Sequence, residues 1–278
     1  MSASQSFDVL ESGAEVDTIA VFRRLKPWHY AAFLAHLAQG VAALTLSLCS
    51  QSACDRYRTF KIPQVHNRLS WNDDPTLTRY VTDDLYAFPF VAVMSSIAFI
   101  SALAHLRYAT VPSSTPLPQN PRRWVEYAAS SSVMMAGILM LCGVWDVTML
   151  SVLSLCNALM CFTGITAERA WASGNKDPSA FFIGTALGLI PWGVILGNLH
   201  HGSPPAFVYV VVYGYLALFC LFPMVFSWQW EGRSAALATE RAERAEIYFL
   251  VLSFSAKAIL LWGVIGGVGQ PNRYADAP

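Results

Sequence analysis

The stretch IYFLVLSFSAKAILLWGVIGG, residues 247–267, decides the fold. It is long enough to cross a bilayer, since a spanning helix needs about 20 mostly apolar residues. One charged residue, Lys257, stands at its middle. An isolated ammonium at that depth costs at least about 2.5 to 3.5 kcal/mol on insertion scales, so it needs a partner, a cavity or chemical modification. Lys257 is therefore the first candidate functional residue.

The rest of the chain has the composition of a polytopic membrane protein. Of its 278 residues, 55% are hydrophobic and 13% charged, and the mean hydropathy is +0.42. These values are too apolar for a soluble domain of this size. We expect an all-α membrane protein, a seven-transmembrane helix bundle forming a single domain over residues 1–278. The predicted spans are 28–48, 85–108, 124–145, 149–170, 181–199, 207–230 and 247–268.

Basic residues are shared unevenly between the two sides of the predicted bundle. Alternating loops place eleven on the side of the N-terminus and six on the other, five of these six in one loop that also carries aspartates. The positive-inside rule then puts the N-terminus in the cytoplasm and the C-terminus outside, most simply in the plasma membrane. The eleven are Arg23, Arg24, Lys26, Arg107, Arg122, Arg123, Arg169, Lys176, Arg233, Arg241 and Arg244, and the six are Arg56, Arg58, Lys61, Arg68, Arg79 and Arg273.

The N-terminal segment 1–22 is polar and acidic, without the basic start and apolar core of a signal peptide, so we expect it to stay in the cytoplasm. The formal net charge of +0 argues against a nucleic-acid partner, because no basic surplus exists to neutralise phosphate. The partner implied by composition is the lipid bilayer.

The long outer loop, residues 50–84, mixes its charges with aromatic and β-branched side chains such as Tyr57, Ile62 and Trp71. A flexible linker would not carry so many. We expect an ordered cap that helps a homodimer to form, with a short β-hairpin and an irregular loop as the two alternatives for its structure.

Six cysteines are present, without metal-ligand spacing. Cys49 and Cys54 lie near the outer end of the first span, where an oxidising exterior permits a bridge. Two free thiols are the simpler interpretation, because a disulfide needs a particular geometry. The other four fall within predicted helices and are interpreted as small buried apolar residues: Cys142, Cys156, Cys161 and Cys220.

Glu126 is the acid best placed to balance Lys257. It lies one helical turn after Arg123 and precedes a run of small and apolar residues. We predict that its helix begins near Leu117 or Pro118, which would bring Glu126 to the depth of Lys257. The other acids near spans are expected at water-facing positions: Asp146 and Glu168 at the interfaces, and Glu240, Glu243 and Glu246 on a solvated face of a helical extension before the last span.

Two histidines lie within spans, and each shares a helix face with a hydrogen-bonding neighbour. Gln39 follows His36 by three residues and Ser101 precedes His105 by four. A lone membrane histidine is more often a structural hydrogen-bonder, but two of them with an acid and a lysine favour a proton-holding network. The pair His200-His201 lies in a Gly-Ser-Pro-Pro turn, which is favoured over a metal site.

Four strings resemble the heliorhodopsins, a branch of the microbial retinal-binding rhodopsins. They are LAHLAQG at 34–40, SALAH at 101–105, RWVEYAASSSVM at 123–134 and SFSAKAILLW at 253–262. The resemblance covers nearly all of the membrane part and is strongest in the third and seventh spans. Members of that family have a cytoplasmic N-terminus, in agreement with the charge count.

The resemblance implies a set of site residues. Lys257 would form a Schiff base with all-trans retinal, Glu126 would be its counterion, and Ser253 stands where rhodopsin pumps usually carry a second aspartate. Tyr127 and Ser131 in the third span would also contact the chromophore. The polyene walls would be Met160, Gly164, Phe219, Phe222 and Phe226, and the cytoplasmic polar cavity would contain His36, Gln39, Ser101, His105 and Arg123. Pro223 departs from the expected pattern of the sixth span.

The function implied is that of a non-enzymatic light sensor or regulator with an unknown signalling partner. Active pumping is not expected, because the outer halves of the third, sixth and seventh spans offer no carboxylate except Asp146 at the rim. One alternative is a passive light-gated proton channel. Another is a retinal-free seven-helix receptor in which Lys257 merely pairs with Glu126.

Overall fold

The computed structural model describes residues 18–71, 78–113, 115, 117, 119–175, 177–230 and 235–270. Seven helices of this described part are long and apolar enough to span a membrane. This confirms the seven-helix membrane bundle, and the chain is an integral membrane protein. The helices are α2 (Thr18–Leu48), α4 (Phe90–Thr110), α5 (Pro121–Leu141), α6 (Val147–Ala172), α7 (Ser179–His201), α8 (Ala206–Trp228) and α9 (Ala235–Val268).

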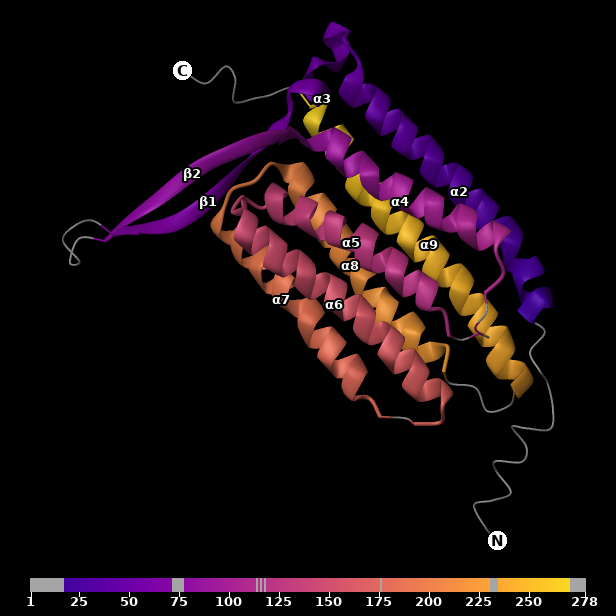
Figure 1. Cartoon of the computed structure of the whole chain (residues 1–278). Helices are drawn as coiled ribbons and strands as arrows, with labels where there is room; N and C mark the ends of the chain where they lie inside the picture. The colour runs from indigo at the N-terminus through magenta and orange to yellow at the C-terminus, as the bar shows by residue number, and fades with distance from the viewer. Residues whose placement is uncertain are drawn as a thin grey trace.

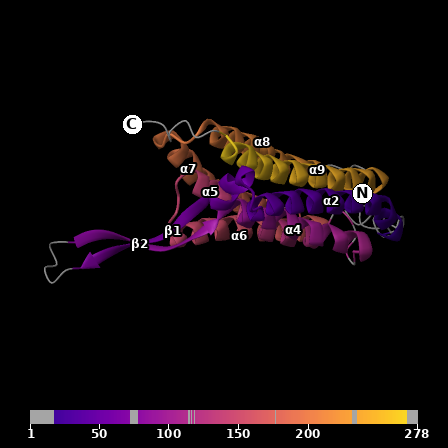
Figure 2. The same cartoon turned by 90° about the horizontal axis from the view of Figure 1, so that it is seen from above.

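Helices pack side by side as antiparallel neighbours in the successive pairs α2–α4, α4–α5, α5–α6, α6–α7 and α8–α9, most of which are joined by short connections (Figure 1). The last helix, α9, closes the bundle by packing against α2, α4 and α8. In the view from above, α8 and α9 lie on one side of the bundle and α4 and α6 on the other (Figure 2). The contacts of α9 with α2, α4 and α8 leave its lysine, Lys257, buried.

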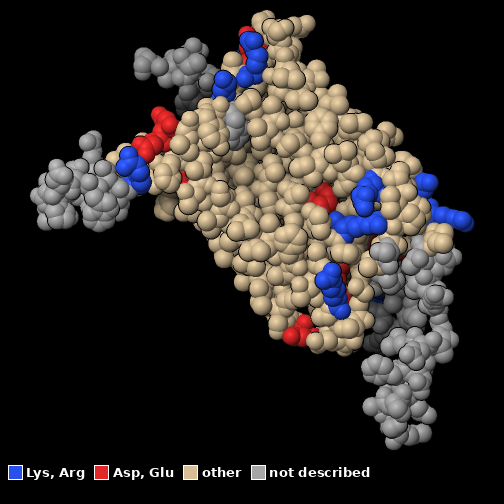
Figure 3. Space-filling view, viewed as in Figure 1, with Lys and Arg blue, Asp and Glu red and all other residues tan. Residues whose placement is uncertain are grey.

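The surface of the bundle carries a wide band free of charged side chains, with the charges gathered towards the two ends (Figure 3). Large apolar side chains are exposed on the helices of the bundle, including Leu103 at 67% and Val210 at 71%. Water would penalise such a surface, whereas lipid tails favour it. The arrangement is that of a bundle surrounded by hydrocarbon.

The ends of several helices differ from the predicted spans. The second helix begins at Phe90 rather than at 85, because residues 85–89 belong to a strand. The third begins at Pro121, with Asn120 as its cap, so the predicted start at Leu117 or Pro118 is wrong, and Pro118 lies outside the described residues. Proline suits this first helical position because the missing N–H would be unpaired there anyway. The first helix starts earlier than predicted, whereas α9 begins at Ala235 and so includes the predicted helical extension before the last span; residues 1–17 are not described.

The long outer loop folds into a short 3-10 turn η2 (Ser52–Cys54), a helix α3 (Asp55–Thr59) and the antiparallel strands β1 (Lys61–Trp71) and β2 (Thr78–Pro89). This hairpin projects from one end of the bundle (Figure 1). The predicted β-hairpin is therefore confirmed over the described residues, and the irregular-loop alternative is wrong. A bulge between Gln64 and Val65 shifts the strand register.

The hairpin is attached to the start of α6. The Val65 N–H donates to the Trp145 carbonyl at 3.1 Å, and the Asn67 N–H donates to Asp146 Oδ2 at 2.8 Å. The other oxygen of Asp146 accepts the Met149 N–H at 2.9 Å as a helix cap. These backbone N–H donors hold the pKa of Asp146 below its usual range. The acid predicted to be a plain interfacial residue thus joins two elements.

The cysteines depart from two expectations. Cys49 and Cys54 form a disulfide with their Cα atoms 5.7 Å apart, so the interpretation as free thiols is wrong. The bridge joins the end of α2 to η2. Cys142 and Cys161 are buried as predicted, whereas Cys220 is exposed on the outer face of α8, where a small apolar side chain can contact lipid.

Candidate functional site

The centre of the bundle holds Lys257 of α9 and Glu126 of α5. Both are buried, with 2% and 6% of their surface exposed, and Lys257 Nζ lies 3.2 Å from Glu126 Oε1. Lys257 Nζ also donates to Ser253 Oγ, one turn earlier, at 2.5 Å. The two groups predicted to balance each other therefore meet, although α5 starts later than predicted.

The carboxylate of Glu126 is held by two further hydroxyl groups. Ser101 Oγ of α4 donates to Oε1 at 2.6 Å, and Ser130 Oγ, one turn further along α5, donates to the same oxygen at 2.9 Å. Hydroxyl donors stabilise the charged form of a carboxylate. The site is therefore built to keep a negative charge beside the amine of Lys257.

A second buried charge cluster lies one turn before Glu126. Arg123 is predicted beside the histidines, but it lies instead in an ion pair with Glu168 of α6 and another with Glu246 of α9, the latter 2.5 Å from Nη1 to Oε1. Asn120 donates its backbone N–H to Glu168 at 2.8 Å and its side-chain N–H to Glu246 at 3.0 Å. The cluster ties three helices together.

The predictions of water-facing positions for Glu168 and Glu246 are wrong, since both are buried. Both carboxylates were expected to face water because each borders charged residues in the sequence. A helical periodicity would have found Glu246, which shares a face of α9 with buried Ala242 and Phe249, four residues before and three after.

The histidines lie in contact between α2 and α4. Gln39 Nε2 is 2.8 Å from His36 Nδ1, and the rings of His36 and His105 stack with centroids 5.5 Å apart. A third histidine, His29, approaches His105 with 3.1 Å between their Nδ1 atoms. His29 was not singled out from the sequence, yet it precedes His36 by seven residues, which is two helical turns and the same face.

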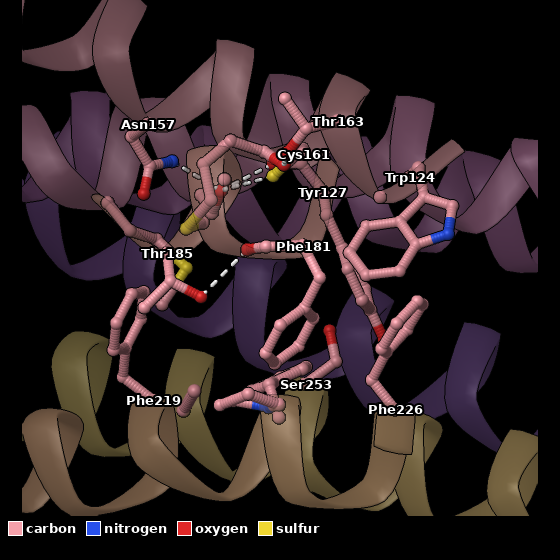
Figure 4. A pocket seen from close by; sticks show the side chains of 18 of the residues that line it. Trp124, Tyr127, Asn157, Cys161, Thr163, Phe181, Thr185, Phe219, Phe226 and Ser253 are labelled. Atoms are coloured by element: carbon pink, nitrogen blue, oxygen red, sulfur yellow. Dashed lines mark hydrogen bonds between the residues drawn. The ribbon is translucent and has the colours of Figure 1, made fainter. Parts of the chain in front are cut away.

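An apolar cavity of about 140 Å³ opens beside Lys257, lined by side chains of α5, α6, α7, α8 and α9, with the aromatic ones on α5, α7 and α8 (Figure 4). Its walls contain all of the residues predicted to surround a polyene. These are Tyr127, Ser131, Met160, Gly164, Phe219, Phe222 and Phe226, together with Ser253 and Lys257. Pro223 is part of the same wall.

Several wall residues were missed from the sequence. Asn157 of α6 is fully buried, and its Nδ2 donates to Ser131 Oγ at 2.7 Å. Its signal was an amide inside an apolar span. Trp124 and Phe181 carried no such signal, because aromatic side chains are ordinary in membrane helices. Trp124 packs where a Cβ on Gly164 would lie, 2.7 Å from indole ring atoms.

The family to which the chain belongs indicates the chemistry of this site. The heliorhodopsin family profile matches residues 25–268. The chain belongs to the heliorhodopsin family. No protein of curated function matches the sequence. Family membership supports a retinal-binding photoreceptor. The residues present fit retinal, since a buried amine with a carboxylate partner faces a cavity with aromatic walls.

Two rhodopsins are among the solved structures similar to this chain. The transmembrane domain and linker region of Salpingoeca rosetta rhodopsin phosphodiesterase superposes with a TM-score of 0.62 at 15% identity, covering 90% of this chain and 81% of the other. Thermophilic rhodopsin from Rubrobacter xylanophilus gives 0.58 at 17% identity, covering 88% and 98%. At such identities the likeness concerns the fold alone.

Proposed function

We propose that this heliorhodopsin is a non-enzymatic photoreceptor in which Lys257 holds all-trans retinal as a Schiff base and Glu126 is the counterion. The observation that supports it is the position of Lys257, whose amine lies 3.2 Å from Glu126 and whose side chain lines the aromatic cavity. Retinal supplies the absorption of visible light and a light-driven isomerisation. A lysine that only paired with an acid would not need such a cavity.

Each side chain of the site then has a role of its own. Glu126 holds the positive charge at the nitrogen, which is strongly favoured in a site from which water is excluded. Ser101 and Ser130 fix the carboxylate, and Ser253 accepts a hydrogen bond from the nitrogen of Lys257. The predicted wall residues, Tyr127 and Phe222 among them, exclude water and hold the polyene.

The histidine cluster and the orientation belong to the same proposal. His36, Gln39, Ser101 and His105 form the polar region on the N-terminal side of Lys257 and can hold a proton. The charge asymmetry supports a cytoplasmic N-terminus and an extracellular hairpin, in the plasma membrane. The hairpin supports a homodimer, because it projects from one end of the bundle, where a second copy can reach it.

Reconstitution with all-trans retinal tests the central assignment. We expect purified protein to develop a visible absorption band, and we expect Lys257→Arg to lose it, since a guanidinium keeps the charge but forms no imine. Lys61→Arg, at the exposed start of β1, is the matched control and keeps the band. Absence of a band in well-folded protein would support the retinal-free receptor instead.

A transport measurement tests whether the protein senses light without active pumping. Uphill movement requires acceptor and donor groups on opposite sides of the nitrogen. Among the described residues of the spanning helices and their caps, the outer half of the bundle has one carboxylate, Asp146, which is held by the hairpin. We expect illuminated cells to show no sustained uphill proton movement. Such movement abolished by Glu126→Gln would contradict the proposal.

A passive light-gated proton channel is the second candidate, and the stacked histidines favour it because they extend from Ser101 towards one end of the bundle. Photocurrents that reverse with membrane voltage would establish the channel. Absence of such currents in cells that contain the pigment would leave the sensor.

A further inference from the structure

Three histidine rings form a line that is longer than the pair implied by the family resemblance. His36 and His105 stack with an interplanar angle of 8°, and His105 stacks in turn on His29, with centroids 5.4 Å apart. The 3.1 Å contact between Nδ1 of His29 and Nδ1 of His105 is a hydrogen bond, so one nitrogen carries a proton and the other accepts it. Such a bond can pass a proton from ring to ring.

The inner end of the line adjoins the charge site. Ser101 donates to Glu126, and His105 follows Ser101 by one turn of α4. His36 Nε2 and His105 Nε2 are buried, and no described residue bonds to either. Buried polar atoms of this kind are normally satisfied by ordered water, which also relays protons. The inner end is therefore suited to receive a proton released beside Glu126.

The other end of the histidine line, at His29, reaches a second cavity. His29 lines a space of about 70 Å³ at the N-terminal end of the bundle, and one water needs about 10 to 15 Å³ of such volume. Val111, in the wall, is 39% exposed, so the cavity lies close to the surface of the described chain. It thus has room for the water that would accept a proton from His29.

Four ionisable groups from three helices face His29 or its cavity. His105 and Tyr108 of α4 contact the His29 ring directly. Arg122 of α5 and Glu246 of α9 belong to the cavity wall. Glu246 is already bound by Arg123 and Asn120, and Arg122 by backbone carbonyls, which leaves His29 as the group able to exchange protons there.

We infer that His29 is the exit residue through which the Schiff-base site exchanges protons with water on the N-terminal side. A proton arriving at His105 Nε2 makes that ring an imidazolium, and its Nδ1 proton passes to His29 Nδ1. His29 then releases the proton on its Nε2 to water in the cavity. Each ring ends neutral in its other tautomer, and the reverse transfers restore the start. This inference rests on the proposed Schiff base at Lys257.

Hydrogen–deuterium exchange of the Schiff base tests the route. Pigment is mixed rapidly into D₂O, and the downshift of the C=N stretch is followed by resonance Raman spectroscopy. We expect His29→Phe and His29→Gln to slow the exchange by at least about tenfold. His201→Phe, which changes an exposed histidine at the opposite end of the bundle, should exchange at the parental rate.

The two variants separate proton carriage from positioning. Glutamine keeps a hydrogen-bonding group for His105 but has no titratable nitrogen. Parental exchange in both variants would overturn the inference, and so would slow exchange in His29→Phe with parental exchange in His29→Gln, since His29 would then only position His105. An unchanged visible band in both variants shows that the pigment is folded.

A measurement without chromophore separates this inference from the proposed function. In retinal-free protein with ¹⁵N-labelled histidine, the ring N–H of His105 should exchange with D₂O more slowly in His29→Gln than in the parent. Equal rates would overturn the inference even if the pigment forms. Failure of the parent to bind retinal would instead reject the proposed function.

Discussion

Lys257 and Glu126 meet across the interface of α5 and α9, with 3.2 Å between Nζ and Oε1 and with both side chains buried. Two charges inside the membrane are tolerated because each is the other's partner. Removing one partner of such a pair leaves an uncompensated charge, which costs about 3 to 5 kcal/mol in buried sites. The pair therefore matters to stability as well as to light absorption.

Replacing the counterion should change the colour of the pigment. We expect Glu126→Gln to shift the absorption band to longer wavelength, because the negative charge no longer stabilises the positive charge at the nitrogen. The unprotonated, near-ultraviolet form should also appear at a lower pH. A pH titration of the absorption spectrum measures both effects. Glu240→Gln, at an exposed position of α9, is the control; equal spectra of the two variants would exclude Glu126 as counterion.

The Arg123 cluster should be a major source of stability. We expect Arg123→Gln to lower the free energy of unfolding by about 3 to 5 kcal/mol, because Glu168 and Glu246 would remain buried without their cation. Thermal unfolding of the detergent-solubilised protein measures the change. The neighbouring Arg122→Gln should have a smaller effect, since Arg122 donates to the backbone carbonyls of Val111 and Pro112 rather than to a buried carboxylate. An equal loss in both variants would contradict the assigned role.

Gly164 should be needed for the shape of the chromophore cavity. A methyl group there would lie 2.7 Å from the indole of Trp124, so Gly164→Ala must displace that ring within the wall. We expect slower pigment formation and a shifted band, measured by absorbance during addition of retinal. Gly193→Ala in α7 is the matched control, because its methyl group meets no atom of the described chain within 4 Å. Identical uptake by both variants would refute the prediction.

The hairpin attachment should depend on pH through Asp146. Its pKa is lowered by backbone N–H donors, so its stabilisation is complete above the pKa of an unfolded aspartate, about 3.9, and is lost as the pH falls through the lower folded pKa. We expect Asp146→Ala to cost about 1 kcal/mol at neutral pH. Melting temperatures recorded as a function of pH provide the measurement. Asp146→Asn keeps an acceptor and should lose this acid dependence; an unaltered dependence would contradict the assignment.

The fold could be predicted largely from the sequence, because membrane spans are long apolar runs and Lys257 stands out within one of them. The same signal exposed Glu126, since few acids fall inside spans. Helix ends were less predictable. The second helix was predicted to begin at residue 85 because residues 85–89 are mostly apolar. These residues instead belong to β2, which pairs with β1.

What the sequence did not reveal depends on contacts between distant segments. Glu168 and Glu246 look solvated beside their charged neighbours, and only the packing of α5, α6 and α9 brings both to Arg123. His29 stands near the N-terminal boundary of a span, and its partner His105 lies on another helix. Trp124 and Phe181 could not be told from ordinary lipid-facing aromatics until the cavity was known.

The helix that carries Lys257 is not interrupted by proline. Unlike α2, α7 and α8, which contain Pro27, Pro191 and Pro223, α9 runs from Ala235 to Val268 without a proline. The part before Lys257 is a rod of about 33 Å at 1.5 Å per residue. A tilt of one degree at the lysine would move the far end by about 0.6 Å. A small tilt of this helix at Lys257 would therefore be a larger displacement at the membrane surface.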